Sequence, residues 1–177
     1  MESEPAKWPE HYGDLEVPVF APHFYYSLST KKDDYSRQIV FGKKTDLSDY
    51  FFEEVKSVLS QIPFKPDLFI IVPSSKMLKF SPTILGLGRK LSKEFNIPFK
   101  RSIKRIRERT KLTDCSNQEE RYASVSGSFR VTRKLKGEKI VLLDDTRVSG
   151  VTLLECTKIL KEAGASDVAA VCLGINT

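Results

Sequence analysis

Residues 139–152 read KIVLLDDTRVSGVT, and this stretch decides the fold class. The unbroken apolar run that ends at Leu143 is typical of a strand buried on both faces in a parallel sheet. Two acids follow it directly, and a helix is predicted over residues 152–163, with Gly164 at its C-terminal cap. The stretch therefore predicts a strand, a turn and a helix, which is the repeating unit of an α/β sheet.

Asp144 and Asp145 stand at the carboxyl end of the predicted strand. Folding gains nothing from desolvated charge, so two carboxylates at this position indicate a bound ligand. A substrate with vicinal hydroxyl groups would satisfy both acids. In open parallel sheets ligands bind beyond the carboxyl ends of the strands, where these acids are predicted to lie.

The turn that follows the acids predicts an anion site. It contains the hydroxyl groups of Thr146, Ser149 and Thr152, and Gly150 lets a ligand approach the backbone closely. Exposed N–H groups and the positive end of the helix dipole favour a phosphate there. The competing interpretation is an ordinary strand-to-helix turn with an aspartate cap. Two acids, three hydroxyls and a glycine in register favour the binding loop.

The rest of the chain repeats the alternation of strands and helices. Ser81 and Pro82 are typical of an N-cap followed by the first residue of a helix. Strands are predicted at residues 67–72, 97–106, 128–131 and 168–173, a loop at 107–120, and helices at 46–61 and from Ser81 onward. We therefore expect an α/β fold with a mainly parallel central sheet and helices on both faces.

Residues 1–35 differ from this pattern. Four prolines punctuate a set of aromatic residues, so the segment is predicted to be an irregular but packed arm. We expect an N-terminal arm or hood at 1–35 and a core domain at 36–177. One of Phe24, Tyr25 and Tyr26 is a candidate for stacking on a base, and the two histidines, His11 and His23, are predicted to be structural.

The composition sets further limits on location and partners. A chain of 177 residues with 40% hydrophobic content can bury a core without disulfides or a structural metal. Its three cysteines are scattered and lack zinc-site spacing, which predicts a reducing, cytoplasmic location. No apolar run suits a leader or a membrane span, so no membrane partner is expected. The net charge of +6 suits a polyanionic partner such as nucleic acid, a phosphorylated metabolite or an anionic membrane, and charge alone does not choose among them.

The stretch from 139 to 152 resembles the signature of a known family. A hydrophobic run followed by Asp-Asp-x-x-Thr-Thr-Gly-x-Thr binds 5-phosphoribosyl-1-pyrophosphate (PRPP) in type I phosphoribosyltransferases, and this sequence is similar to it. The resemblance implies the Rossmann-like fold of that family, with the ribose hydroxyls on Asp144 and Asp145. It also implies a 5-phosphate site made by Thr146, Arg147, Val148, Ser149, Gly150 and Thr152.

The layout from about Asp67 to Leu173 is similar to the competence-associated ComF family. Gln118 and Arg121 precede a Gly-Ser-Phe segment at 127–129 shortly before the PRPP loop, as in that family, but this sequence lacks the family's zinc ribbon and its Arg-Gly-Phe-Asn segment. Val148 replaces the aspartate that contacts the base in purine-salvage members. Hypoxanthine-guanine salvage of the usual kind is therefore not expected.

The resemblance implies an enzyme that transfers the 5-phosphoribosyl group of PRPP to a nitrogen acceptor, commonly a nucleobase, and releases pyrophosphate. It further implies a homodimer and Mg²⁺ held mainly by the substrate, with no direct protein ligand. Ser74, Ser75 and Lys76 match the family's pyrophosphate loop, and Lys79 lies close enough in sequence to replace Lys76. An ordinary strand-to-helix connection is the alternative for this segment.

Seven basic residues between Lys100 and Lys111 form the densest basic run in the chain. The resemblance implies that this region closes over PRPP, and Arg105, Arg107 and Lys111 are predicted to contact the departing pyrophosphate. A solvated basic edge strand and a strip that binds nucleic-acid phosphates are equally open interpretations. The alternative function is accordingly a protein of this fold that senses PRPP or a nucleotide, or binds nucleic acid, without catalysis.

Overall fold

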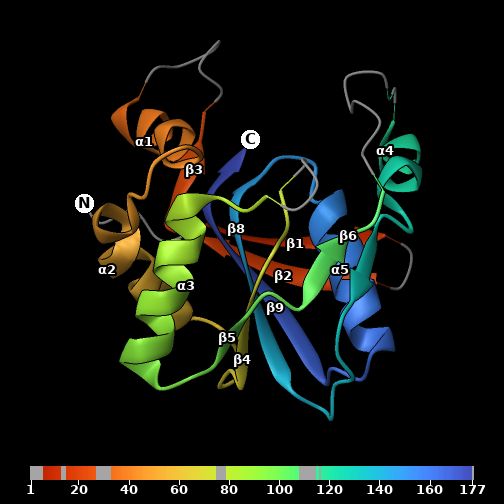
Figure 1. The fold of residues 1–177 in the computed structure, drawn as a ribbon. Helices are drawn as coiled ribbons and strands as arrows, with labels where there is room; N and C mark the ends of the chain where they lie inside the picture. Colours follow the sequence, from red (N-terminus) through yellow and green to blue (C-terminus); the bar gives the residue numbers. More distant parts are fainter. Residues whose placement is uncertain are drawn as a thin grey trace.

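The computed structural model describes residues 6–12, 15–26, 33–74, 79–107, 115 and 117–176. In this part of the chain, seven strands form one sheet in the order β1-β2-β9-β8-β4-β5, with β3 paired to β9 (Figure 1). The strands are β1 (Ala6–Tyr12), β2 (Leu15–Ala21), β3 (His23–Tyr25), β4 (Leu68–Ile71), β5 (Phe99–Lys100), β8 (Lys139–Arg147) and β9 (Asp167–Asn176). All pairings are parallel except that of β1 with β2. A separate antiparallel ladder joins β6 (Ile103–Arg105) to β7 (Phe129–Val131).

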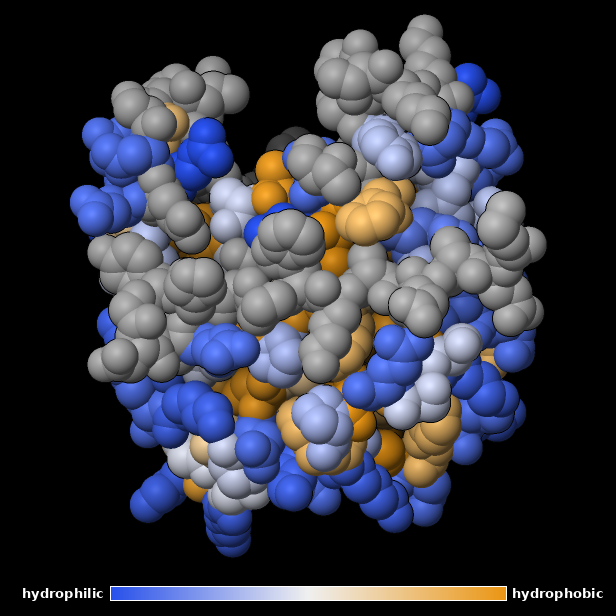
Figure 2. All heavy atoms as spheres, turned by 180° about the vertical axis from the view of Figure 1, so that it is seen from behind, coloured by the Kyte–Doolittle hydropathy of each residue, from blue (hydrophilic) through white to orange (hydrophobic). Residues whose placement is uncertain are grey.

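Helices cover both faces of the sheet, as predicted (Figure 1). One face packs against α1 (Asp34–Gly42), α2 (Ser48–Leu59) and α3 (Pro82–Phe95). The other packs against α5 (Val151–Glu162) and the β6–β7 ladder, with α4 (Gln118–Val125) outside α5. Seen from behind, hydrophilic residues gather along the lower rim of the molecule (Figure 2). No helix in the described residues is long and apolar enough to cross a membrane.

The buried positions 140–143 of the central strand β8 are all apolar because helices cover both faces of the sheet there. Ile140 and Leu142 pack on the side of α5, whereas Val141 and Leu143 pack on the side of α2 and α3. Successive side chains of a strand point to opposite faces, so a strand covered on both faces needs apolar residues at every position. All four side chains are at most 2% exposed.

The N-terminal segment corrects a prediction. Residues 6–25, expected to be irregular, form β1, β2 and β3 and extend the main sheet beyond β9. The prolines suggested irregular backbone, but pairing of β2 with β9 begins only at Val19, so the missing N–H of Pro18 interrupts no bond to β9. The division into an arm and a core, and a role of residues 1–35 as a hood, stay predictions.

Two boundaries also differ from the predictions. The predicted strand 97–106 is divided, because β5 pairs with β4 while β6 leaves the main sheet to pair with β7. The predicted loop 107–120 includes the start of α4, whose N-cap Asn117 accepts a hydrogen bond from Glu120 N (2.8 Å). Helix α1 was not predicted, although Asp33 caps it in the same way by accepting from Ser36 N (2.9 Å).

Candidate active site

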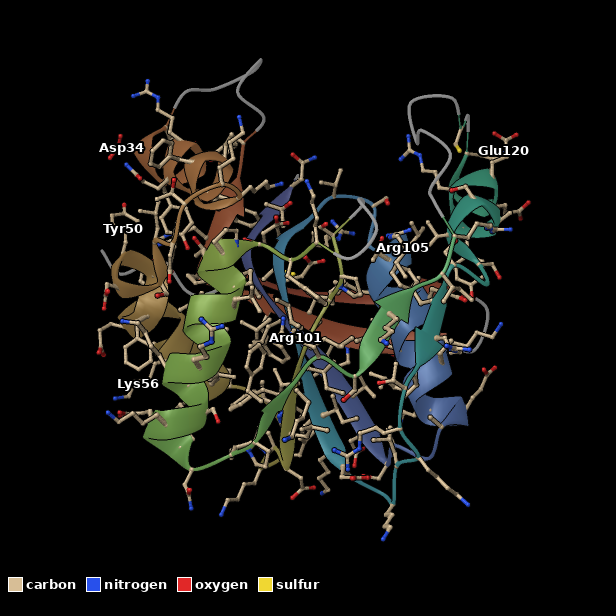
Figure 3. All side chains as sticks on the ribbon, in the orientation of Figure 1. Asp34, Tyr50, Lys56, Arg101, Arg105 and Glu120 are labelled. Atoms are coloured by element: carbon tan, nitrogen blue, oxygen red, sulfur yellow. The ribbon has the colours of Figure 1, made fainter. Side chains whose placement is uncertain are left out.

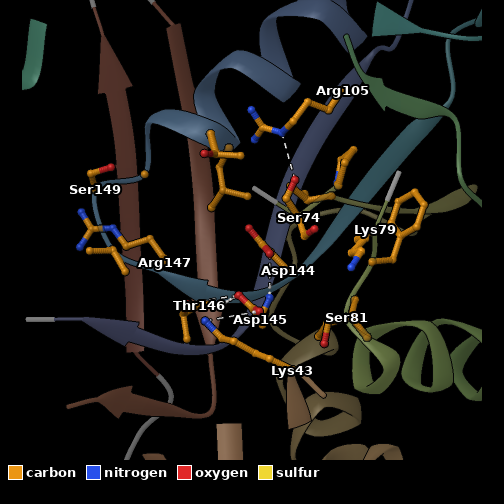
Figure 4. A pocket seen from close by; sticks show the side chains of 18 of the residues that line it. Lys43, Ser74, Lys79, Ser81, Arg105, Asp144, Asp145, Thr146, Arg147 and Ser149 are labelled. Carbon is orange, nitrogen blue, oxygen red and sulfur yellow. Dashed lines mark hydrogen bonds and ion pairs between the residues drawn. The ribbon is translucent and has the colours of Figure 1, made fainter. Parts of the chain in front are cut away.

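A pocket of about 550 Å³ lies beyond the carboxyl ends of β4 and β8 (Figure 4). Its walls come from segments that are far apart in the sequence. They include Lys43, Lys44, Ser74, Lys79, Phe80, Ser81, Arg105, Asp144, Asp145, Thr146, Arg147, Val148, Ser149, Gly150 and Thr152. Among the lining residues five are cationic and two are carboxylates, so the pocket favours a polyanion.

The two acids are held by strand structure and not by a loop. Strand β8 runs four residues beyond its predicted end at Leu143, because β9 continues beside it as far as the pairing of Arg147 with Ile175. Asp144 Oδ1 accepts a hydrogen bond from Asp145 N (2.8 Å), and Asp145 Oδ1 accepts one from Thr146 N (2.7 Å). The backbone therefore fixes both carboxylates at the pocket floor.

Asp144 lies where a negative charge is unfavourable. Burial raises its pKa well above the ordinary aspartate value, and the charge of Asp145 raises it further, against the opposing effects of Lys43 and Arg105. Beneath it, burial and then Asp144 raise the pKa of the Cys156 thiol, which therefore stays neutral. Ligand hydroxyl groups or a cation at the pocket floor would favour the ionised form of Asp144.

Asp145 has a cation beside it in the same pocket. Its Oδ2 lies 3.5 Å from Nζ of Lys43, which follows the last residue of α1 (Figure 4). The lysine side chain is 41% exposed, so the pair is screened by solvent and readily exchanged for a ligand.

The turn into α5 offers backbone N–H groups to an anion. Gly150 is the N-cap residue, with φ of 72°, a left-handed conformation that favours glycine. Glycine has no side chain to cap the helix, and the N–H groups of the first turn have no carbonyl partner within an α-helix. These donors and the helix dipole face the pocket region lined by Ser149 and Thr152.

Arg105 forms the opposite wall. Only 4% of it is exposed, its Nε donates to the carbonyl of Ser74 (3.0 Å), and its guanidinium lies 4.3 Å over the ring of Phe129. Burial lowers its pKa, yet arginine stays charged. Its buried Nη1 has no hydrogen-bond partner among the described residues. Arg105 is therefore a fixed cation at the border of the pocket, with one guanidinium nitrogen that has no hydrogen-bond partner among the described residues.

Comparison with known proteins decides the family. Residues 85–174 match the phosphoribosyl transferase domain, and this match spans β8, the turn and α5. The chain belongs to the phosphoribosyltransferase domain family. This confirms the predicted fold class and the predicted enzyme class, whereas the ComF-like subfamily stays a prediction.

The relatives of this phosphoribosyltransferase domain are longer proteins. It is 28% identical over 159 residues to amidophosphoribosyltransferase 1, chloroplastic, of Arabidopsis thaliana, covering 86% of this chain and 25% of that protein. It is 27% identical to the chloroplastic amidophosphoribosyltransferase of Vigna aconitifolia, covering 82% and 27%. The chain thus spans about a quarter of their length. A solved purine phosphoribosyltransferase from Pyrococcus horikoshii aligns with a TM-score of 0.41 and 19% identity, covering 86% of this chain and 77% of that one.

The structure brings most of the predicted site residues of this phosphoribosyltransferase domain together. Those that line the pocket are Ser74, Arg105, Asp144, Asp145, Thr146, Arg147, Val148, Ser149, Gly150 and Thr152. Arg107 does not line it, because its side chain is exposed and its Nη2 donates to the carbonyl of Ser126 (2.7 Å). Ser75, Lys76 and Lys111 lie outside the described residues. The roles given to all these residues stay predictions.

Sequence reasoning missed Lys43, Lys44, Phe80 and Ser81 as lining residues. No local pattern identifies the two lysines, because only the packing of α1 and α2 on the sheet brings their segment to β8. Of the three aromatics predicted as candidates for base stacking, Phe24 and Tyr26 do not line the pocket, and the side chain of Tyr25 lies outside the described part of the structure. His23 contacts Glu54 (Nε2 to Oε1, 3.3 Å) and packs edge-on against a tyrosine ring.

The pocket's carboxylates suit a hard cation. Among the described residues no group of three or more His, Cys, Asp and Glu side chains could hold a metal ion. Asp144 and Asp145 nevertheless offer carboxylate oxygens, the type of ligand that Mg²⁺ prefers, in the same pocket as the cationic residues that favour a polyanion. Two carboxylates and a phosphate-bearing substrate are a typical donor set for this ion.

Proposed function

We propose that this chain binds PRPP in the pocket and transfers its 5-phosphoribosyl group to a nitrogen acceptor, with release of pyrophosphate. The observation that carries the proposal is the convergence of three groups on one cationic pocket: the paired acids of β8, the uncapped N-terminus of α5 and the buried Arg105. Each suits a different part of PRPP, and membership of the phosphoribosyltransferase domain family supports PRPP as the substrate.

The substrate lies across the end of the sheet in this proposal. Its ribose hydroxyls donate to Asp144 and Asp145, and its 5-phosphate accepts from the N–H groups and hydroxyls between Thr146 and Thr152. The pyrophosphate lies toward Ser74 and Arg105, with Lys79 beside them. The two acids thereby hold the anomeric carbon between the leaving group and the open side of the pocket.

The reaction forms a bond from the acceptor nitrogen to the anomeric carbon while the carbon–oxygen bond to pyrophosphate breaks. The electron pair of the broken bond leaves with pyrophosphate, and the acceptor loses its proton. Arg105 stabilises the negative charge that develops on the leaving group, and the carboxylates stabilise positive charge on the ribose. Bound Mg²⁺ would be held mainly by the substrate, with Asp144 and Asp145 as the carboxylates beside it, and would neutralise part of the pyrophosphate charge.

A nucleobase is the acceptor class that the family resemblance implies. Val148 lines the pocket, is 54% exposed, and has no polar group for reading a base. Its contribution to acceptor binding is therefore apolar contact alone. A cytoplasmic homodimer is part of the proposal on the same resemblance, and light scattering of the purified chain tests the dimer.

The test follows pyrophosphate release from PRPP with a panel of purine and pyrimidine bases, with and without Mg²⁺. The double variant Asp144→Asn, Asp145→Asn should abolish both turnover and PRPP binding measured by calorimetry. The control Asp34→Asn, Glu119→Gln removes two exposed carboxylates outside the pocket and should behave like the unmodified chain. Turnover that survives the first double change would exclude this site. PRPP binding without turnover on any base would instead support a PRPP sensor on the same fold.

A further inference from the structure

Positive charge is concentrated around the β6–β7 ladder. Residues 99–107 and 128–137, which contain the two strands and their flanks, include nine of the chain's 29 Lys and Arg residues and none of its 23 Asp and Glu residues. Because the whole chain has a net charge of +6, the rest of it has a net charge of −3. The excess charge of the protein therefore belongs to one small region.

Four of these cations are exposed, and we call them together the basic face: Lys100, Arg101, Lys104 and Arg130. Arg105 belongs to the pocket, and Arg133 is paired with Glu138 (2.9 Å). None of the four forms an ion pair with a carboxylate of the described residues. Figure 3 shows Arg101 well below Arg105 along the segment that leads from β5 into β6.

The arrangement of the basic face works against folding. Lys104 stands directly opposite Arg130 in the antiparallel register, and like charges at directly opposed positions destabilise a ladder. The neighbouring positions Ile103, Arg105 and Phe129 are buried, so strand alternation turns Lys104 and Arg130 outward. No carboxylate of the described residues forms an ion pair with either cation, so an anionic partner would relieve their repulsion.

We propose that the basic face binds the phosphate backbone of double-helical nucleic acid. A two-stranded ribbon fits the major groove, and a row of cations matches closely spaced phosphates. Single strands are usually bound by bases stacking on exposed aromatic rings. The rings nearest this face are occupied: Phe129 is 4% exposed beneath Arg105, and Phe99 and Phe80 pack against the core, with Arg101 Cζ 5.8 Å from the Phe80 ring centroid.

Lys104 and Arg130 do not line the PRPP pocket, whereas Arg101 lies at its border, with Cζ 5.8 Å from the ring centroid of the lining residue Phe80. Lys104 and Arg105 are adjacent in β6, so their side chains point to opposite sides of the strand. Only Arg105 lines the pocket. Binding of a duplex is therefore expected to leave PRPP binding unchanged, and this inference stands even if the proposed transferase activity fails.

The test measures the binding of a labelled DNA duplex of random sequence by fluorescence anisotropy over a series of salt concentrations. Four phosphate contacts predict a slope of log affinity against log salt of about −3.6, because each contact contributes about −0.9. The double variant Lys104→Gln, Arg130→Gln should bind more weakly and reduce the slope by about 1.8. The control Arg89→Gln, Lys93→Gln removes two exposed cations from α3 and should keep the original slope.

A second variant separates loss of binding from loss of folding. Lys104→Glu places opposite charges across the ladder, so it should raise the free energy of unfolding while weakening duplex binding more than Lys104→Gln does. An RNA duplex of the same length should bind more weakly than the DNA, because the major groove of A-form RNA is too narrow for the two-stranded ribbon. Any of four results would overturn the proposal: an equal loss in the α3 control, tighter binding of a single strand, tighter binding of phosphatidylserine vesicles, or displacement of the duplex by PRPP.

Discussion

Replacement of Arg105 by methionine should remove transferase activity while leaving the protein about as stable as before. The guanidinium is buried, it has no carboxylate within ion-pair distance among the described residues, and its Nη1 has no hydrogen-bond partner there. Burial lowers its pKa, which shows that the folded protein disfavours this charge. Methionine has a similar length and no charge to desolvate.

The opposing contributions to stability are similar in size. The variant loses the charged hydrogen bond to Ser74, about 1.5–3 kcal/mol, and the contact with Phe129, about 2 kcal/mol when desolvated. It no longer buries an unsatisfied donor, which costs about 1–3 kcal/mol, and sulfur against the ring contributes roughly 0.3–1.5 kcal/mol. The variant also avoids the cost of burying the guanidinium charge, which adds to the contributions that stabilise it. We expect the free energy of unfolding to change by less than about 1 kcal/mol.

The activity should change far more. Removing a fixed charge that stabilises a transition state typically lowers kcat by about 10²–10³-fold, or roughly 2.7–4 kcal/mol. Urea unfolding followed by circular dichroism gives the stability, and pyrophosphate release from PRPP gives kcat. Arg89→Met, an exposed position on α3, is the matched control and should change neither quantity appreciably.

One combination of results would refute this reasoning. If Arg105→Met lowered the free energy of unfolding by more than about 3 kcal/mol and retained turnover, its bond to Ser74 would be the reason for the arginine. Arg105 would then be a structural residue, and the pyrophosphate would have to lie elsewhere in the pocket.

Three further predictions test the site and the packing next to it. Because the pKa of Asp144 is raised in the folded state, the empty protein should lose stability as the pH rises from the ordinary aspartate pKa, about 3.9, through the raised value. The variant Asp144→Asn should flatten this pH dependence and stabilise the protein at neutral pH. Urea unfolding of both proteins at about pH 5 and about pH 8 measures the difference. The carboxylate of Glu155 accepts hydrogen bonds from Tyr122 Oη (3.1 Å) and Gly127 N (2.7 Å). Glu155→Leu should therefore lower the free energy of unfolding by about 3 kcal/mol, and Glu155→Gln by less than about 1.5 kcal/mol. Equal losses in the two variants would contradict this account. Lys43→Gln should lower the free energy of unfolding by less than about 1 kcal/mol, because the ion pair of Lys43 with Asp145 is partly exposed. The same variant should weaken PRPP binding severalfold in calorimetry. Tighter PRPP binding would mean that the ion pair competes with the ribose for Asp145.

The sheet was predictable where one physical cause dominates the sequence. The run from Ile140 to Leu143 is apolar at every position because both of its faces are covered, and the strand was found. The N-terminal strands could not be read in this way. Pro18 marks a break in most strand patterns, and only the late start of the β2–β9 pairing makes it acceptable.

The site was predictable to the extent that it is local in sequence. The acids, the hydroxyls and Gly150 lie within nine residues, so a single strand-turn-helix unit places them. Lys43 lies about a hundred residues earlier and contacts Asp145 only because α1 packs beside the end of β8 and β9. Such a contact has no counterpart in local periodicity, which explains why it was missed.

The length of β8 gives the two acids different surroundings. Because the strand continues to Arg147, side-chain alternation extends through both carboxylates. Asp144 continues the row of Ile140 and Leu142 toward α5, where Cys156 and Arg105 are its neighbours. Asp145 continues the other row, toward the segment that carries Lys43. In the proposed binding mode, a ribose that contacts both acids lies across the end of β8. Its 5-phosphate then lies next to the N-terminus of α5, and the opposite side of the ribose faces α1.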